Sequence, residues 1–450
     1  MRLVPVILSI SLFCGMVACT SRSYFADAEE ALDTSGYFNL LDHVSTYYPR
    51  GIALNFPGYI VGFEEAPRSR VTDGPDDVLL DESVYAAGYT VKLFAKYLRF
   101  NLPFISHVMR YEGRLYGEGN CALYSLYHNQ GKVVVDYCGD YARNGNTGSH
   151  DYGYAFSGSW DAVDLLRERL ADDIASHGYS HLVVAVMGLD TPQEEAIRNY
   201  RSLVSAVRRN AGSDFEPLFV GITWPSFFAN RWFDPMWETF AYSPIADRSD
   251  ILGLTWLGVL FNEAILPLAD RIEINVIAHS FGARAASIGL CVGPVILRDG
   301  KAGASLQPTG QVDDFIGLAP AFSLRRFIDE NPLFYENVYY RDYCPKIRRF
   351  IFTASRNDNA FSPIFWSSPV GEHEEMRDFC GQQQTVHSVC ASVDSNGDIN
   401  GYDTSAKISY IDTSALMKYR VPGTKGTGHS DIYRPEVGKF LWHLINSSPQ

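Results

Sequence analysis

The chain has no run of lysine and arginine residues, and its 38 basic side chains are outnumbered by 52 acidic ones, which gives a formal net charge of −14. With nothing to neutralise phosphates, it is not expected to bind nucleic acid. It also has no Cys-x-x-Cys pair and no Cys/His cluster with zinc-site spacing, so no metal and no cofactor are expected. At 450 residues, of which 46% are hydrophobic, the chain can bury a large core.

Long apolar runs are also missing. Beyond the amino terminus, no segment approaches the roughly 18 uninterrupted apolar residues of a transmembrane helix. The first residues differ, because Met1 and Arg2 give a short positive start and residues 3–17 form an apolar run that is too short to span a bilayer. We therefore interpret residues 1–18 as a signal peptide, which implies that the rest of the protein is exported.

The signal segment ends with Ala18 before Cys19, a pattern that resembles the lipobox of bacterial lipoproteins. It predicts lipidation of Cys19 and attachment to a bacterial membrane through the lipid anchor. Thr20 favours the outer membrane over the inner one if the source is Gram-negative. The alternative is an ordinary secretory signal in which Cys19 is incidental.

Six cysteines remain once Cys14 is removed with the signal and Cys19 is assigned to lipid. An even number in an oxidising compartment predicts disulfides. Cys121 and Cys138 flank a hairpin-like segment, and Cys380 and Cys390 close a short loop. These are the two pairs that we expect first.

From about residue 154 onward, apolar runs alternate with amphipathic segments. Strands are predicted near 181–187, 217–223, 272–278, 315–318 and 349–353, and helices at 160–174, after residue 190 and around 437–444. This alternation is typical of an α/β protein with a doubly wound, mostly parallel sheet, whose functional loops lie at the carboxyl ends of the strands. Residues 82–99 are predicted to be helical, and 110–141 to contain strands and turns that begin the sheet.

Ser280 lies where the predicted strand 272–278 gives way to a helix of small residues. A serine on such a sharp turn needs tiny neighbours two positions away on each side, and Ala278 and Gly282 satisfy this. The pattern indicates a nucleophile elbow and hence an α/β-hydrolase fold, with His279 structural. The alternative is a buried turn with an idle serine.

A serine nucleophile needs a base and an acid, which follow it in the order Ser, acid, His in this fold. Asp358 comes just after the strand 349–353 and suits the acid, although a turn or cap role is the alternative. His429 lies in a glycine-rich loop before the last helix and is the natural base. The intervening segment also holds His373 and His387, so His429 could instead be a surface histidine.

Two backbone amides are expected to hold the oxyanion, one from Phe281 after the nucleophile and one from Leu189 after an earlier strand. Met187 stands where hydrolases carry a histidine, a departure that leaves the backbone donor unaffected.

Four segments together resemble a family of bacterial α/β-hydrolase-like proteins of poorly defined function. They are Met187-Gly-Leu-Asp-Thr191, Gly221-Ile-Thr-Trp-Pro-Ser226, Ile274 to Ser280, and Ala354 to Asp358. The likeness covers about residues 179–358. It implies a serine-hydrolase site and no particular substrate.

The sequence thus predicts a signal peptide at 1–18, an amino-terminal extension of unknown function at 19–110, and an α/β-hydrolase domain at 111–450 with insertions near 227–256 and 361–415. Two segments stay ambiguous. The aromatic-rich stretch 224–256 suits either an apolar acyl site or helix packing. Asp394 to Asn400 has alternating oxygen side chains, as calcium loops do, but Ile399 replaces the required glycine, so an acidic turn is favoured.

The predicted function is hydrolysis of a small-molecule or lipid ester, or of a related acyl bond, at a membrane surface by Ser280, Asp358 and His429. An acyltransferase could use the same residues. The alternative from another class is a catalytically idle hydrolase-fold lipoprotein that serves as a binding or structural module.

Overall fold

The computed structural model describes residues 53–67, 69, 71, 73, 101–114, 119–126, 138, 152–189, 191, 193–226, 246–296, 298, 310–328, 338–358, 360, 369–382, 388–418 and 428–447. The strands are β1 (Pro57–Pro67), β2 (Asn101–Glu112), β3 (Cys121–Ser125), β4 (His181–Val186), β5 (Pro217–Thr223), β6 (Glu273–His279), β7 (Val312–Leu318), β8 (Ile347–Ala354), β9 (Ser388–Val393), β10 (Ile399–Asn400) and β11 (Ile408–Asp412). The main helices are α5 (Ala155–Ser176), α6 (Gln193–Ala211), α8 (Trp256–Val259), α9 (Phe281–Cys291), α10 (Arg325–Ile328), α11 (His373–Gln382) and α12 (Pro435–Asn446).

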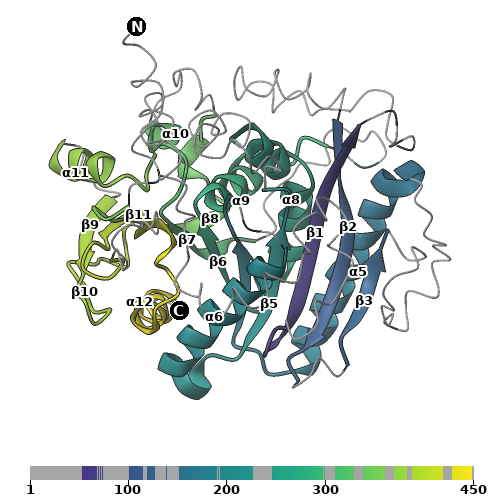
Figure 1. Ribbon diagram of the computed structural model, residues 1–450, viewed down its shortest axis with the longest axis horizontal. Coiled ribbons are helices and arrows are strands. Elements are labelled where there is room, and N and C mark those ends of the chain that lie inside the picture. Colours follow the sequence, from purple (N-terminus) through teal and green to yellow (C-terminus); the bar gives the residue numbers. More distant parts are fainter. Residues whose placement is uncertain are drawn as a thin grey trace, which may run out of the picture.

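The eleven strands in the described part of the chain form one sheet in the order β10-β9-β11-β8-β7-β6-β4-β5-β1-β2-β3, which runs across Figure 1. Neighbours from β9 to β1 pair in parallel, and among these described strands the antiparallel pairs lie at the two edges. The predicted α/β architecture with a mostly parallel sheet is therefore confirmed, and the five predicted strands correspond to β4, β5, β6, β7 and β8.

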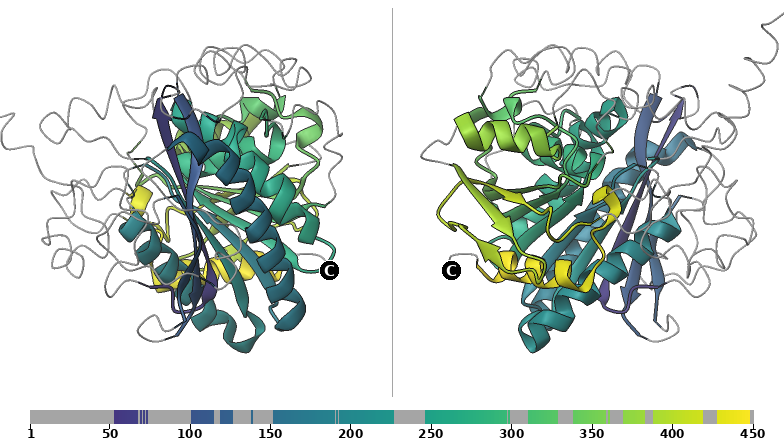
Figure 2. Two further views of the ribbon diagram at one scale, coloured as in Figure 1. Left: turned by 90° about the vertical axis from the view of Figure 1, so that its right-hand side faces the viewer. Right: turned by 60° about the vertical axis from the view of Figure 1, so that its left-hand side comes forward.

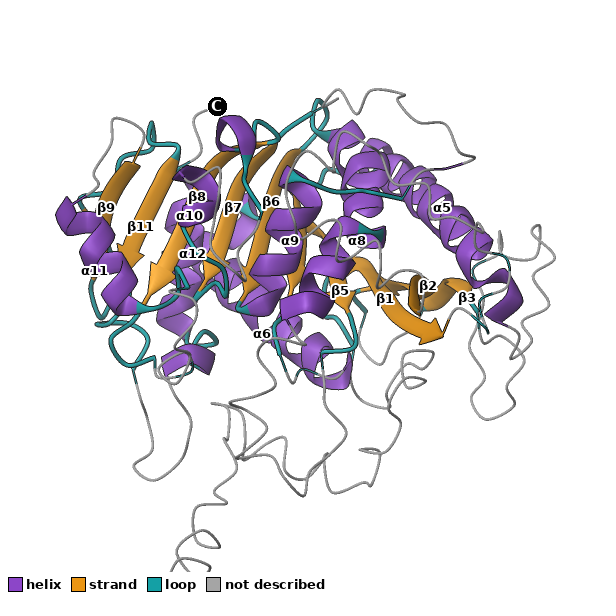
Figure 3. Ribbon diagram, turned by 90° about the horizontal axis from the view of Figure 1, so that it is seen from above, coloured by secondary structure: helices purple, strands orange, loops and turns teal. Residues whose placement is uncertain are grey.

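Helices cover both faces of the sheet (Figure 3), and the buried apolar side chains accordingly form two clusters. One cluster joins α5, α8 and α9 to one face of the sheet. The other joins α6 and α12 to the opposite face. α6 and α12 lie side by side (Figure 2), and they approach so closely at Gly438 that a Cβ there would overlap the backbone of Ala206.

The structure divides the chain differently from the sequence-based scheme. The boundary predicted at 110/111 falls inside β2, and β1 pairs with β5, so both strands belong to the same sheet as the residues after 111. The segment 361–415, predicted to be an insertion, contributes β9, β10 and β11 to the sheet. The helix predicted at 82–99 lies outside the described residues.

One described helix, Ala246–Leu268, has the length and composition of a membrane span, but 83% of its most apolar window is buried inside the fold. Its side chains join the cluster that covers the face of the sheet next to α9. The last part of the predicted 227–256 insertion is thus a core helix, while residues 227–245 lie outside the described residues.

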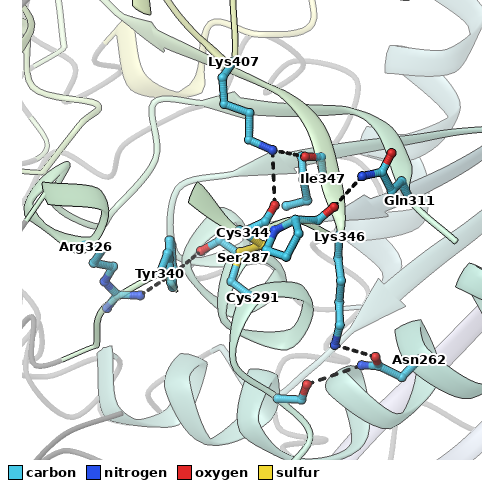
Figure 4. The surroundings of a disulfide bond; sticks show 12 residues. Asn262, Ser287, Cys291, Gln311, Arg326, Tyr340, Cys344, Lys346, Ile347 and Lys407 are labelled. Atoms are coloured by element: carbon cyan, nitrogen blue, oxygen red, sulfur yellow. Dashed lines mark hydrogen bonds between the residues drawn. A yellow bond between two sulfur atoms is a disulfide. The ribbon is translucent and has the colours of Figure 1, made fainter. Parts of the chain in front are cut away.

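Three disulfides link described parts of the chain: Cys121 to Cys138, Cys380 to Cys390, and Cys291 to Cys344. The first two are the pairs expected from the sequence. The third joins the end of α9 to the turn before β8, beside Lys407, which donates to the Cys344 carbonyl oxygen at 3.2 Å (Figure 4). It therefore ties the helix that follows Ser280 to the strand that leads to Asp358.

Candidate active site

Parallel pairing brings the carboxyl ends of the central strands to one edge of the sheet. The last residues of these strands are Val186 of β4, Thr223 of β5, His279 of β6, Leu318 of β7, Ala354 of β8 and Asp412 of β11. The predicted site residues that are described all follow such strand ends or lie in the loop before α12. This edge is where ligands bind in open α/β sheets.

Ser280 occupies the turn between β6 and α9 with a φ of +53°, a backbone conformation that is strained for a residue with a side chain. Its neighbours show why they must be small. Ala278 is fully buried, and a Cβ at Gly282 would overlap the carbonyl oxygens of Val186 and Met187 at the end of the adjacent strand. The Ala-x-Ser-x-Gly pattern thus permits the sharp turn that sequence analysis predicted for it.

Backbone hydrogen bonds hold this turn from the opposite side. The Ser280 amide donates to the Leu318 carbonyl at 3.0 Å, and the Ser280 carbonyl accepts from the Ala321 amide at 3.1 Å. Farther along α9, Arg284 forms two hydrogen bonds of 2.6 Å with the carboxylate of Asp250, and both side chains are almost completely buried. The turn and the first part of the helix are therefore fixed to the surrounding core.

The structure brings together His429 and Asp358, which are 71 residues apart. His429 Nδ1 lies 2.7 Å from Asp358 Oδ2, and the Asp358 side chain is 1% exposed against 13% for His429. The other Asp358 oxygen accepts the Ala360 amide at 2.9 Å. Since a carboxylate can only accept, Nδ1 is the donor in this hydrogen bond.

The loops that carry this pair are joined by their backbones. The Gly428 amide donates to the Asn357 carbonyl at 2.8 Å. The Asn357 side chain in turn donates to the carbonyls of Ser414 and Met417 at 2.9 and 3.1 Å, which anchors the Asp358 loop to the segment after β11. Nothing in the sequence around Asn357 indicated this anchoring role.

His279, predicted to be structural, contacts the loop of the candidate base. Its Nε2 lies 2.8 Å from the His429 carbonyl oxygen, and the two imidazole rings are 4.6 Å apart between centroids. Burial, and after it the neighbouring His429, lowers the pKa of His279 to about 3. His279 is therefore neutral near pH 7, and its Nε2–H donates to the carbonyl.

The loop after β4 passes directly beside the candidate nucleophile. A Cβ at Gly188 would lie 2.7 Å from the Ser280 Cβ and 3.2 Å from its Oγ, so only glycine fits here. The next residue is Leu189, which is 37% exposed, and Phe281 is the first residue of α9. Met187 is 2% exposed and receives a contact of 3.7 Å from the Tyr433 hydroxyl to its sulfur, so it is a core residue.

Other predicted features lie elsewhere or outside the described residues. His373 Nε2 lies 3.2 Å from Asp412 Oδ2. Asp394 accepts the amides of Asn396 and Asp398 within a tight turn, while the Asp398 side chain pairs with Lys439. Cys19, His387 and the aromatic stretch 227–245 lie outside the described residues.

Among the described residues, no group of three or more His, Cys, Asp or Glu side chains has the geometry to hold a metal ion. A cavity of about 720 Å³ lies along α6, where Arg201, Arg208 and Arg209 are among the residues that line it. No predicted site residue lines this cavity.

Comparison with known proteins found no matching family model and no matching curated protein. Among solved structures, the chain is similar to the catalytic core domain of an acetyl xylan esterase from Trichoderma reesei, with a TM-score of 0.26, 12% identity, and coverage of 60% of this chain and 98% of that one. It is also similar to an uncharacterized protein from Bacillus cereus ATCC 10987, with a TM-score of 0.27, 12% identity, and coverage of 69% and 76%.

Proposed function

We propose that the protein is a serine hydrolase that cleaves an ester or related acyl bond, on an α/β-hydrolase fold, with Ser280 as nucleophile, His429 as base and Asp358 as the acid that orients it. The observation that carries the proposal is the 2.7 Å hydrogen bond between His429 Nδ1 and Asp358, at the sheet edge where Ser280 occupies a strained strand-to-helix turn. A buried carboxylate, an oriented imidazole and an elbow serine are the three parts of a Ser-His-Asp triad.

In the proposed reaction, His429 Nε2 accepts the Ser280 hydroxyl proton as Oγ attacks the acyl carbon. The amides of Leu189 and Phe281 donate hydrogen bonds to the oxyanion that develops on the former carbonyl oxygen. Collapse of this intermediate breaks the bond to the leaving group, which takes the proton from His429. Water then attacks the acyl-enzyme with His429 again as base, releasing the acid and regenerating Ser280.

The cellular setting is part of the same proposal. Lipidation of Cys19 after removal of residues 1–18 would hold the enzyme at a bacterial membrane, where lipid esters are available as substrates. Metabolic labelling with an alkyne fatty acid tests this. The full chain should be labelled and the Cys19→Ser variant should not, whereas equal labelling of both would exclude Cys19 as the anchor.

The activity is tested with a fluorophosphonate probe, which reacts only with an activated serine. Wild-type protein should be labelled, while Ser280→Ala abolishes labelling and His429→Ala slows it by roughly four orders of magnitude. Ser202→Ala and His443→Ala, which alter residues of α6 and α12, serve as controls and should label like the wild type. A folded wild-type protein that is not labelled would favour the idle hydrolase-fold module instead.

A further inference from the structure

Two side chains that follow β5 contact the loop beside Ser280. Trp224 is 8% exposed, and its indole Nε1–H donates to the Met187 carbonyl oxygen at 2.9 Å. Ser226 is 2% exposed, and its hydroxyl accepts the Thr191 amide at 3.2 Å and lies 3.4 Å from the Thr191 carbonyl oxygen. Both side chains therefore bind the backbone of the loop that follows β4.

These contacts lie on either side of Gly188, the residue of this loop that approaches Ser280. Trp224 fixes the peptide group between Met187 and Gly188, and Ser226 fixes the backbone of Thr191. The residues between the two attachments include Leu189 and Gly188, where an added Cβ would lie 2.7 Å from the Ser280 Cβ. With both ends of so short a segment hydrogen bonded, the direction of the Leu189 amide has little freedom.

The topology of the sheet explains why these residues are well placed for the task. β4 and β5 are parallel neighbours in register from His181 with Pro217 to Val186 with Ile222. The segments that leave them consequently start side by side. The end of β5 is held from α6, since the Tyr200 hydroxyl donates to the Ile222 carbonyl at 2.5 Å, two residues before Trp224.

An oxyanion donor accelerates a reaction only to the extent that it already points to where the charge develops. A loop that had to reorganise during the reaction would lose much of that benefit, even if substrate still bound. Met187 anchors the loop through an apolar side chain that is buried in the core. The hydrogen bonds from Trp224 and Ser226 restrain the loop backbone at Met187 and at Thr191.

We infer that Trp224 and Ser226 are positioning residues that hold the Leu189 amide in place for the oxyanion, an inference that rests on the proposed hydrolase function. They act through the loop backbone and touch neither substrate nor Ser280. Their loss lowers transition-state stabilisation while ground-state binding of the substrate is retained.

The test compares Trp224→Phe, Ser226→Ala and Ser226→Thr with wild-type full-length protein, using a 4-nitrophenyl ester as substrate and phenylboronic acid as a mimic of the tetrahedral intermediate. Trp224→Phe and Ser226→Ala should each lower kcat by about 10-fold to 100-fold, with KM changed less than about twofold. The affinity for the boronic acid should fall in parallel with kcat, and Ser226→Thr, which keeps the hydroxyl, should retain activity.

Two matched variants control for loss of a buried hydrogen bond in general. Trp256 is a buried indole that donates to the Pro103 carbonyl at 2.7 Å, and Ser249 is a buried hydroxyl that donates to the Ala246 carbonyl at 2.8 Å. Trp256→Phe and Ser249→Ala should lower the melting temperature at least as much as the test variants, yet leave kcat and boronic acid affinity unchanged.

The outcomes separate the two proposals. If wild-type protein reacts with the fluorophosphonate probe but Trp224→Phe and Ser226→Ala keep wild-type kcat, or change only KM, the positioning role is overturned and the hydrolase function stands. If a folded wild type does not react with the probe, the hydrolase function fails, and the positioning role fails with it.

Discussion

At Gly428 the chain has no room for a side chain, because a Cβ there would lie 2.9 Å from the carbonyl carbon and oxygen of Asn357. The same two residues are joined by the hydrogen bond that holds the His429 loop against the Asp358 loop. Gly428→Ala should therefore push the two loops apart and lengthen the contact between His429 and Asp358. We expect kcat to fall by about 10-fold or more, since misplacement of a catalytic group by about 1 Å can cost roughly 100-fold.

Gly178→Ala is the matched control, because a Cβ at Gly178 would meet nothing within 4 Å. Ester hydrolysis rates and melting temperatures of both variants give the comparison. A Gly428→Ala protein as active as Gly178→Ala would mean that the two loops do not need this close approach.

At the scale of the helix, α9 is anchored by a buried ion pair rather than by apolar contacts alone. Arg284 and Asp250 are 1% and 2% exposed, and Arg326 also lies 3.6 Å from Asp250. Asp250→Asn would leave two buried guanidinium groups without their carboxylate, which typically costs about 3–5 kcal/mol. We expect this loss in the free energy of unfolding, measured by urea denaturation at pH 7.

Asp398→Asn provides the comparison, since Asp398 pairs with Lys439 at 2.8 Å but is 52% exposed. Exposed pairs contribute about 0–1 kcal/mol. Equal losses in the two variants would show that the Asp250 network does not anchor α9 in the way that its burial indicates.

The strands of the sheet show which elements the sequence could predict. β4 and β5 are continuous apolar runs that are buried along their whole length, so their pattern identified them. β1 and β11 were missed as members of the sheet because a strand's neighbours depend on tertiary pairing, and local pattern does not specify them. Ser280, Asp358 and His429 could be proposed because strand ends and glycine-rich loops leave a signal along the chain. Trp224 and Ser226 stood out only within the segment from Gly221 to Ser226 that carries the family resemblance, and nothing in that segment indicated their hydrogen bonds to the loop after β4.

At the scale of the whole molecule, buried histidines make stability depend on pH. Burial lowers the pKa of both His107 and His279 to about 3, whereas an unfolded histidine titrates near 6.5. Below pH 6.5 the unfolded chain therefore binds protons that the folded protein does not, and stability falls as the pH falls from 6.5 towards 3. Each of the two histidines should lower the free energy of unfolding by about 2 kcal/mol at pH 5 relative to pH 7.

Urea denaturation at pH 7 and pH 5 measures this effect. In His107→Gln the difference between the two pH values should shrink by about 2 kcal/mol, whatever the variant's stability at pH 7. An unchanged pH dependence in His107→Gln would argue that His107 becomes protonated in the folded protein.

The disulfides restrain the unfolded chain to different extents. Cys291 and Cys344 are 53 residues apart in sequence, and Cys380 and Cys390 only 10. Loop-closure entropy predicts that the free energy of unfolding falls by about 4 kcal/mol in Cys291→Ser/Cys344→Ser and by about 3 kcal/mol in Cys380→Ser/Cys390→Ser. The disulfide between Cys291 and Cys344 lies at the end of α9 that is remote from Ser280. The folded fraction of the Cys291→Ser/Cys344→Ser variant should therefore still react with the fluorophosphonate probe. Denaturation midpoints and probe labelling, measured together, separate a loss of stability from a loss of the site. A folded variant that the probe no longer labels would mean that the disulfide shapes the turn at Ser280 itself.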